Sequence, residues 1–198
     1  MNCFYKEYFK RLLDIVWGII GFVVCSIVFI IVGPIIYLTD KGPILYISDR
    51  LGKNGKIFKM FKFRSMKMNA PDIRNSDGTT FNSENDSRVT WIGKILRKTS
   101  LDELPQFINV LFGDMSLIGP RPDLPDAMNI YTDEEKRKLE VKPGITGYNQ
   151  AYYRNSADLK LRFYNDVEYA ENISFYLDIK IFFQTIKTIL LKTNIYRN

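Results

Sequence analysis

The sequence contains no histidine and only two cysteines among its 198 residues. The missing histidine excludes Ser-His and Cys-His nucleophile pairs, histidine general bases and zinc sites of the His-Glu-x-x-His kind. Cys3 and Cys25 lack metal-ligand spacing, and Cys25 lies in an apolar run, so a disulfide framework is not expected. Any chemistry must therefore rely on carboxylates, Lys, Arg, Tyr or a hard metal ion held by oxygen ligands.

Acidic residues are in the minority. Lys and Arg total 28 against 22 Asp and Glu, which gives a formal net charge of +6. A basic chain favours anionic partners, namely nucleic acid, anionic lipid or a phosphorylated substrate. The length predicts one domain, or one domain with a small appendage.

Charge is absent altogether from Ile15 to Leu38, a run of 24 residues. As a straight helix this run would be about 36 Å long at about 1.5 Å per residue. Crossing the hydrocarbon core of a bilayer takes about 20 such residues. The run therefore predicts a membrane segment.

Two topologies remain open for this segment, because basic residues lie on both sides of it. These are Lys6, Lys10 and Arg11 before it, and Lys41, Arg50, Lys53 and Lys56 after it. A spanning helix would leave one basic flank on the wrong side of the membrane. A re-entrant segment, which enters and leaves by one face, satisfies both flanks but needs a break. The candidates for that break are Ser26, Gly33 and Pro34.

The rest of the chain predicts an α+β fold that is mostly helical, with a short β-hairpin. Residues 44–47 and 57–63 are the expected strands, joined through the glycine-bearing turn at 52–55. Helices are expected at 91–97, 105–112 and 173–191, together with an exposed, salt-bridged helix at 133–138. The polar stretch 69–90 reads as a loop. Residues 50–67 hold seven basic and no acidic residues, which indicates either a solvated face or a surface for headgroups or phosphate.

Two neighbouring carboxylates, Asp102 and Glu103, lie just before the predicted helix that starts at Pro105 and ends at Gly113. An ionised Asp at that place is a candidate nucleophile, and its neighbour is a candidate base or metal ligand. The alternative is structural, since Ser100 and Glu103 have the spacing of a capping box. Pro105 weakens that alternative, because it would occupy the fifth position of a helix capped by Ser100.

Further candidates for binding anions are two arginines and a glycine-bearing turn. Arg121 lies between two prolines, and a guanidinium held by a stiff turn suits phosphate recognition, although an ordinary turn is the commoner explanation of this motif alone. Residues 142–147 form another tight turn that could present N–H groups to phosphate. Arg154 follows aromatic residues that serve either as a stacking surface or as part of the core.

Taken together, four segments resemble the bacterial sugar transferases, and in particular the small monotopic polyprenyl-phosphate phosphoglycosyl transferases. The segments are 62–66 (KFRSM), 100–106 (SLDELPQ), 113–122 (GDMSLIGPRP) and 142–147 (KPGITG). They occur in the family's order, and the resemblance covers about residues 5 to 191. It implies transfer of a sugar 1-phosphate from a UDP-sugar to undecaprenyl phosphate, with Mg²⁺ as cofactor and release of UMP.

The resemblance also implies roles for individual residues. Asp102 falls on the family's nucleophile and Glu103 on its acidic partner, and both are the expected metal ligands. The substrate-binding positions carried over from the family are all basic: Lys62, Arg64, Arg97, Arg121 and Arg154. The physical argument agrees, because attack by a carboxylate on a diphosphate requires neutralising positive charge.

The family resemblance favours the re-entrant topology on the cytoplasmic face of the bacterial inner (plasma) membrane. It implies a membrane-inserted segment at residues 1–40 and a catalytic domain at 41–198. The expected partners are a UDP-sugar, undecaprenyl phosphate and anionic membrane lipid, with no nucleic acid and with oligomerisation left open. A lipid-binding adaptor and a nucleic-acid-binding module are the rival interpretations. The adaptor does not explain the carboxylates and the proline-flanked arginine together, and the membrane segment argues against the nucleic-acid-binding module.

This sequence departs from the family at two positions. The family's kink usually reads Ser-Pro, whereas this chain has Ser26-Ile27, so the kink must depend on Ser26 or on Pro34. Family members also usually carry Gln before the Arg-x-Gly turn, where this chain has Ser48 before Arg50.

Overall fold

The computed structural model describes residues 4–75, 81, 83–154 and 156–191. The chain begins with a π-helical turn, Tyr5–Phe9, followed by the long helix α2, Lys10–Asp40. The antiparallel hairpin β1 (Leu45–Leu51) and β2 (Ile57–Phe63) comes next, and then α3 (Trp91–Thr99) and α4 (Gln106–Phe112). This is the predicted fold, mostly helical with a short hairpin, although β1 is longer than expected.

The second half of the chain contains a small parallel strand pair and three helices. Strand β3, Ser116–Ile118, pairs with β4, Gly144–Thr146. The helices are α5 (Tyr148–Tyr152), α6 (Leu159–Glu171) and α7 (Phe175–Leu191), so the predicted C-terminal helix is confirmed. Short 3₁₀ segments occupy Leu101–Glu103, Pro125–Asn129 and Glu135–Glu140. The last of these replaces the exposed helix predicted at 133–138, and its Lys138 is buried rather than exposed.

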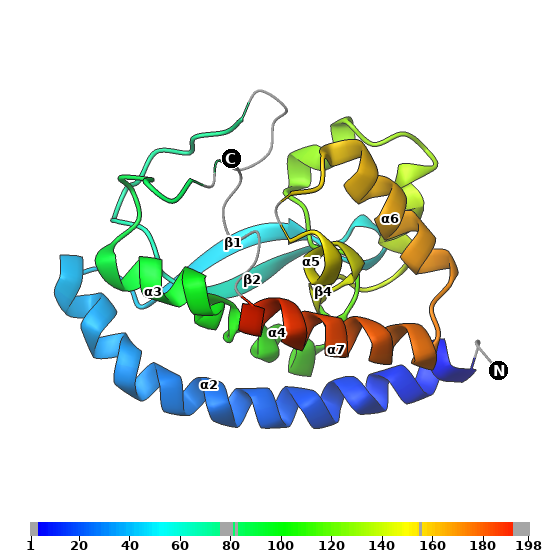
Figure 1. Ribbon diagram of the computed structural model, residues 1–198, viewed down its shortest axis with the longest axis horizontal. Coiled ribbons are helices and arrows are strands. Elements are labelled where there is room, and N and C mark those ends of the chain that lie inside the picture. Colours follow the sequence, from blue (N-terminus) through cyan, green and yellow to red (C-terminus); the bar gives the residue numbers. More distant parts are fainter. Residues whose placement is uncertain (1–3, 76–80, 82, 155, 192–198) are drawn as a thin grey trace.

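Helix α2 runs as a shallow bow along one edge of the molecule, past α7, α4 and α3 (Figure 1). It is helical throughout, including Ser26 and Pro34, so neither residue ends the helix. Ser26 and Pro34 can nevertheless bend α2. The Ser26 hydroxyl donates to the Phe22 carbonyl at 2.9 Å, and Pro34 lacks the N–H of a normal helical residue. The expected sharp break is therefore a continuous curve in the structure.

Both halves of α2 pack against the rest of the chain. In the first half, Gly18 and Gly21 allow close approach of α4, since an added Cβ at Gly21 would lie 2.3 Å from the Phe107 ring. In the second half, Cys25 and Ile36 join a buried cluster with Phe63, Ile92 and Leu96. One face of α2 thus belongs to the core, although its sequence is apolar all round.

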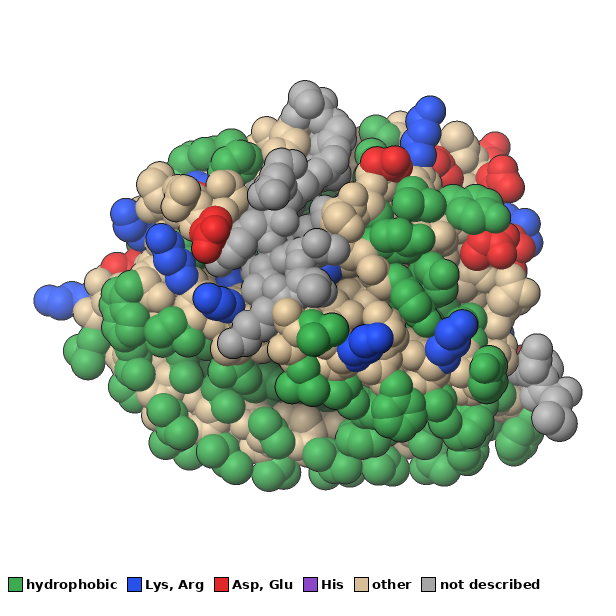
Figure 2. Space-filling model, viewed as in Figure 1, with side chains coloured by type: hydrophobic (Ala, Val, Ile, Leu, Met, Phe, Trp, Pro, Cys, Tyr) green, Lys and Arg blue, Asp and Glu red, His purple; other side chains and the backbone are tan. Residues whose placement is uncertain are grey.

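The other face of α2 is apolar and exposed. Ile30 and Leu38 are each more than 70% exposed, and Phe183 and Leu190 of α7 are also exposed apolar side chains. Figure 2 shows hydrophobic side chains gathered along the margin formed by these helices. Within the described residues, the segment Tyr5–Asp40 is the one helix long and apolar enough to cross a membrane, judged by length and composition.

The hairpin positions the site through its packing on α4. Phe58 and Met60 of β2 lie in a buried cluster with Val110 and Met115, while Lys62, two residues further along, reaches the carboxylates described below. Asn54 and Gly55 have φ values of +57° and +74°, which these two residue types adopt at low cost in a tight turn. The Asn109 side chain joins α4 to β2, accepting from Phe61 N–H at 3.1 Å and donating to Lys59 O at 2.7 Å.

Candidate active site

Asp102 and Glu103 lie on the 3₁₀ segment that connects α3 to α4. Helix α3 ends at Ser100, whose φ of +59° turns the chain, and Pro105 precedes the first residue of α4. The capping-box alternative is excluded by the contacts of Glu103. Its backbone N–H donates to the Ser100 carbonyl at 3.3 Å, and its carboxylate accepts from residues on other elements.

The carboxylate of Glu103 is held by two cations. Lys62 Nζ donates to Glu103 Oε1 at 2.7 Å, and Arg121 Nη1 lies 3.5 Å from the same oxygen. Burial by itself would raise the pKa of Glu103, but the charges and hydrogen bonds of Lys62 and Arg121 outweigh it and lower the pKa to about 2. Glu103 is therefore ionised at every physiological pH.

Asp102 is shifted in the opposite direction. Burial and the negative charge of Glu103 raise the pKa of Asp102, while the charges of Lys62, Arg97 and Arg121 partly offset that rise. The two adjacent carboxylates therefore differ, with Glu103 paired to cations and Asp102 left in the more negative field. A carboxylate of raised pKa is the better nucleophile of the two once it is ionised.

Three of the other basic residues predicted for the site surround this segment or the turns that hold it. Arg97 of α3 donates from Nε to Ser65 Oγ at 2.9 Å, and its charge acts on Asp102. Arg154, whose φ of +54° is unusual for arginine, donates from Nη2 to Ser100 Oγ at 3.1 Å. Arg121 side-chain atoms are 42% exposed, so its guanidinium is accessible from solvent.

The structure does not bring Arg64 to this group. Its side chain is buried beyond the end of β2, where Nη1 lies 2.6 Å from Asp40 Oδ1 and Nη2 donates to the Ile36 carbonyl at 3.3 Å. Asp40 and Ile36 belong to the last two turns of α2. In the structure Arg64 therefore tethers the end of the long helix, and its predicted contact with substrate stays a prediction.

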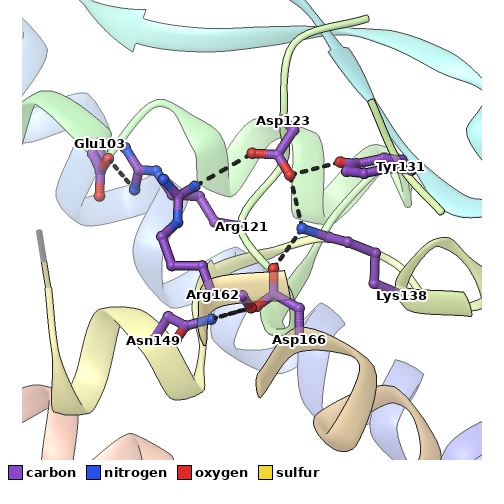
Figure 3. Close-up of polar contacts among 8 residues, drawn as sticks. All are labelled: Glu103, Arg121, Asp123, Tyr131, Lys138, Asn149, Arg162 and Asp166. Carbon is purple, nitrogen blue, oxygen red and sulfur yellow. Dashed lines mark hydrogen bonds and ion pairs between the residues drawn. The ribbon is translucent and has the colours of Figure 1, made fainter. Parts of the chain in front are cut away.

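A buried ion cluster supports the turn that carries Arg121 (Figure 3). Lys138 donates to Asp123 at 2.7 Å and to Asp166 at 2.5 Å, and Tyr131 and Arg162 also donate to Asp123. Burial opposes ionisation of Asp123, but Lys138 and Arg162 lower its pKa to about 2. Asp123 follows Arg121 by two residues, so this cluster fixes the backbone that presents the guanidinium.

Sequence reasoning missed this cluster. The sequence predicts an exposed helix there because three acidic residues precede three basic ones at salt-bridge spacing, and no local signal marks Lys138 as buried. Asp123 follows the proline-flanked Arg121 by two residues, and that position is the one hint the sequence contains.

The pair Asp102 and Glu103 can supply oxygen ligands to a metal ion. Among residues 4–75, 81, 83–154 and 156–191, no group of three or more His, Cys, Asp or Glu side chains has the arrangement of a metal site. From the described residues, the protein would therefore provide these two carboxylates. That number suits Mg²⁺, which is commonly bound by one or two carboxylates together with substrate phosphates and water.

Comparison with known proteins agrees with this geometry. A family model described as bacterial sugar transferase matches residues 5–192. The chain is 46% identical to a galactosyl transferase, CpsE, of Streptococcus agalactiae over 93% of this chain and 42% of that protein. It is 40% identical to an undecaprenyl-phosphate galactose phosphotransferase of Salmonella typhimurium, covering 96% of this chain and 42% of the relative.

A relative of similar size is an uncharacterised sugar transferase, EpsL, of Bacillus subtilis. It is 40% identical over 94% of this chain and 89% of its own length. The chain thus spans about two fifths of the first two relatives and nearly all of the third.

Proposed function

Because this chain belongs to the bacterial sugar transferase family, we propose that it transfers a sugar 1-phosphate from a UDP-sugar to undecaprenyl phosphate and releases UMP. Such a transfer would begin the assembly of a surface polysaccharide or another glycoconjugate on a lipid carrier. The observation that carries the proposal is Asp102 beside Glu103, within the field of Lys62, Arg97 and Arg121.

In the first half-reaction, an Oδ atom of Asp102 attacks the phosphorus that carries the sugar. A bond forms between that oxygen and phosphorus, the bond from phosphorus to the bridging oxygen of the diphosphate breaks, and the electron pair leaves with UMP. Arg121 and Lys62 are positioned to stabilise negative charge that moves onto phosphate oxygens. Asp102 requires no general base because it is nucleophilic when ionised, which fits a chain without histidine.

In the second half-reaction, a phosphate oxygen of undecaprenyl phosphate attacks the same phosphorus. The bond from phosphorus to Asp102 breaks, and the carboxylate is restored as the lipid-linked diphosphate sugar forms. Dividing the reaction in this way allows a soluble donor and a membrane-bound acceptor to use one site in turn.

Mg²⁺ is the proposed cofactor, with Asp102 and Glu103 as its protein ligands. Their fit is supported by the chemistry of the donor set, since the two neighbouring carboxylates offer the oxygen ligands that Mg²⁺ prefers. When bound, Mg²⁺ supplies charge neutralisation for the diphosphate of the donor. Removal of the ion with a chelator should therefore weaken donor binding as well as turnover.

The proposed location is the cytoplasmic face of the bacterial inner (plasma) membrane, with α2 as the re-entrant segment. Asp14, near the start of α2, accepts from Ser116 Oγ at 2.9 Å and from Leu117 N–H at 2.8 Å. Asp40, at the other end of the helix, pairs with Arg64. Both ends are thus bound to the domain that carries the site, which favours one face of the membrane over a full crossing.

The test is trapping of the covalent intermediate. The protein is incubated with Mg²⁺ and labelled UDP-galactose, UDP-glucose or UDP-N-acetylgalactosamine, without lipid acceptor, and analysed by intact-protein mass spectrometry. A phosphosugar adduct on the native protein, absent from Asp102→Asn, is the expected result. Asp126→Asn, at an exposed aspartate of another segment, is the matched control and should form the adduct normally. A fully active Asp102→Asn protein would refute the assigned nucleophile.

A further inference from the structure

Arg50, near the end of β1, forms no ion pair with an acidic residue in the part of the chain that the structure describes. Its Nε donates a long hydrogen bond, 3.4 Å, to Ser48 Oγ, and its side chain is only partly exposed. Among the residues that the structure describes, neither of its Nη atoms hydrogen-bonds to protein and no carboxylate forms a salt bridge with it. A partly buried guanidinium with unused donors is costly unless something else pairs with them.

The backbone brings Arg50 to the turn that carries Arg121. Leu51, the next residue, donates its N–H to the Asp123 carbonyl at 2.9 Å, which connects the end of β1 to residues 121–123. Leu51 and Arg121 also line the same small recess, together with Pro120. Arg50 and Arg121 therefore flank a single backbone contact.

The positive charges of Arg50 and Arg121 act on each other. Burial and the positive charge of Arg121 lower the pKa of Arg50, so the two groups repel each other in the free protein. Asp123, the acid that favours ionisation of Arg50, accepts from Lys138, Tyr131 and Arg162. Among the described residues, the one ion pair of Arg121 is its 3.5 Å contact with Glu103. An anion between the two guanidinium groups would remove the repulsion and use their donors.

We propose that Arg50 and Arg121 form a clamp for a phosphate group of one of the two substrates. The inference rests on the proposed function, and it adds Arg50 to the residues predicted to bind substrate. A guanidinium presents a planar fork that pairs with two phosphate oxygens at once. The phosphate belongs either to the diphosphate of the nucleotide donor or to the lipid acceptor.

Ser48 has a defined part in this arrangement. By accepting from Nε it orients the Arg50 side chain and leaves both Nη atoms for the ligand. Ser48 and Arg50 are two residues apart on one strand, so they project from the same face of the hairpin. Ser48, which precedes the Arg-x-Gly turn, therefore orients the Arg50 guanidinium of the proposed clamp.

The experiment measures binding instead of turnover. Affinity for UDP in detergent, and for undecaprenyl phosphate in phosphatidylcholine nanodiscs, is determined for the native protein, Arg50→Gln and Arg137→Gln. Arg137 is the matched control, because it is an exposed arginine paired with Glu171 at 2.7 Å. We expect Arg50→Gln to lose at least about tenfold in affinity for one probe, or about 1.4 kcal/mol, and Arg137→Gln to lose none.

The outcomes separate the two phosphate sources and the two proposals. A loss confined to UDP assigns the clamp to the donor, and a loss confined to undecaprenyl phosphate assigns it to the acceptor. Unchanged affinity for both probes, or no binding of either by the native protein, overturns the clamp. If Arg50→Gln does not fold, Arg50→Lys takes its place, and native affinity in that variant also overturns it. Neither assay needs a covalent adduct, so failure of the proposed reaction is detected separately.

Discussion

At the scale of single residues, Asp102 and Glu103 are chemically similar, but their surroundings shift their pKa values in opposite directions. Lys62 and Arg121 contact Glu103, so its negative charge is fixed in place. Among the residues that the structure describes, none forms a comparable ion pair with Asp102, which experiences both burial and the charge of its neighbour. The family resemblance predicts the nucleophile by position, and the raised pKa of Asp102 is a physical reason to expect the same assignment.

The raised pKa of Asp102 predicts the pH dependence of the first half-reaction. Only the ionised carboxylate attacks phosphorus, so adduct formation should fall as pH decreases through a midpoint above the ordinary aspartate value of about 3.8. Glu103→Gln removes a negative neighbour and should move that midpoint to lower pH, even if the rate itself drops. The measurement is the initial rate of adduct formation against pH, by intact-protein mass spectrometry.

As a control, the thermal unfolding midpoints of the native protein and Glu103→Gln are measured across the same pH range. If both proteins stay folded throughout, the pH profile reports the ionisation of Asp102. Equal midpoints in the native protein and Glu103→Gln would contradict the claim that Glu103 raises the pKa of Asp102.

At the scale of elements, the sequence determined the helices and the hairpin well, because their signals are local. Pro105 and Gly113 bracket α4, and the turn at Gly55 separates two strands of suitable pattern. The prediction for 133–138 is wrong because acidic residues followed by basic ones suit an exposed helix and a 3₁₀ segment over an acidic cluster equally well. Which lysine is buried depends on Asp123 and Asp166, which lie 15 and 28 residues away.

The shape of α2 could not be predicted from local signals either. Ser26 and Pro34 were read as breaks, but the helical hydrogen bonds around them and the packing on both sides keep the helix continuous. The two glycines of its first half gave no sequence signal of their role, because a glycine that permits close helix packing looks like any other.

The contact between α2 and α4 gives a prediction at this scale. Gly21→Ala should lower the melting temperature, because the new Cβ would lie 2.3 to 2.5 Å from three atoms of the Phe107 ring. Such overpacking costs about 1–3 kcal/mol, which exceeds the gain of about 1 kcal/mol from helix propensity. Thermal unfolding in detergent, followed by circular dichroism, measures the shift.

Gly33→Ala is the matched control on the same helix. Its added Cβ would meet the Ile44 side-chain tip at 3.2 Å, which can shift at little cost. That variant should keep the native melting temperature or exceed it. If Gly21→Ala were as stable as Gly33→Ala, α2 and α4 would not be packed as described.

At the scale of the whole molecule, the long helix forms part of the core and also of an exposed apolar margin. Lys10, Arg11 and Asp14 attach its first turns, since Lys10 pairs with Asp178 of α7 and Arg11 donates to the Val110 and Leu111 carbonyls of α4. Asp40 attaches the other end through Arg64. Between these ends the outward face is apolar, and it continues onto α7 (Figure 2). This arrangement suits a protein that lies in one leaflet with its site facing the aqueous side.

This arrangement predicts the topology in cells. Single cysteines are placed at Glu7 and Lys53, on either side of α2, in a Cys3→Ser, Cys25→Ala background. Both should be protected from a membrane-impermeant maleimide in spheroplasts and labelled after permeabilisation, because both flanks are basic and both ends of the helix bind one domain. A cysteine at Ile27, which is 56% exposed on the apolar face, should resist labelling even after permeabilisation while lipid covers it.

An exported protein with a free cysteine serves as the positive control. Labelling at position 7 before permeabilisation would contradict the model of one membrane face, because α2 would then have to give up its contacts with Ser116 and Asp178 to reach the other side.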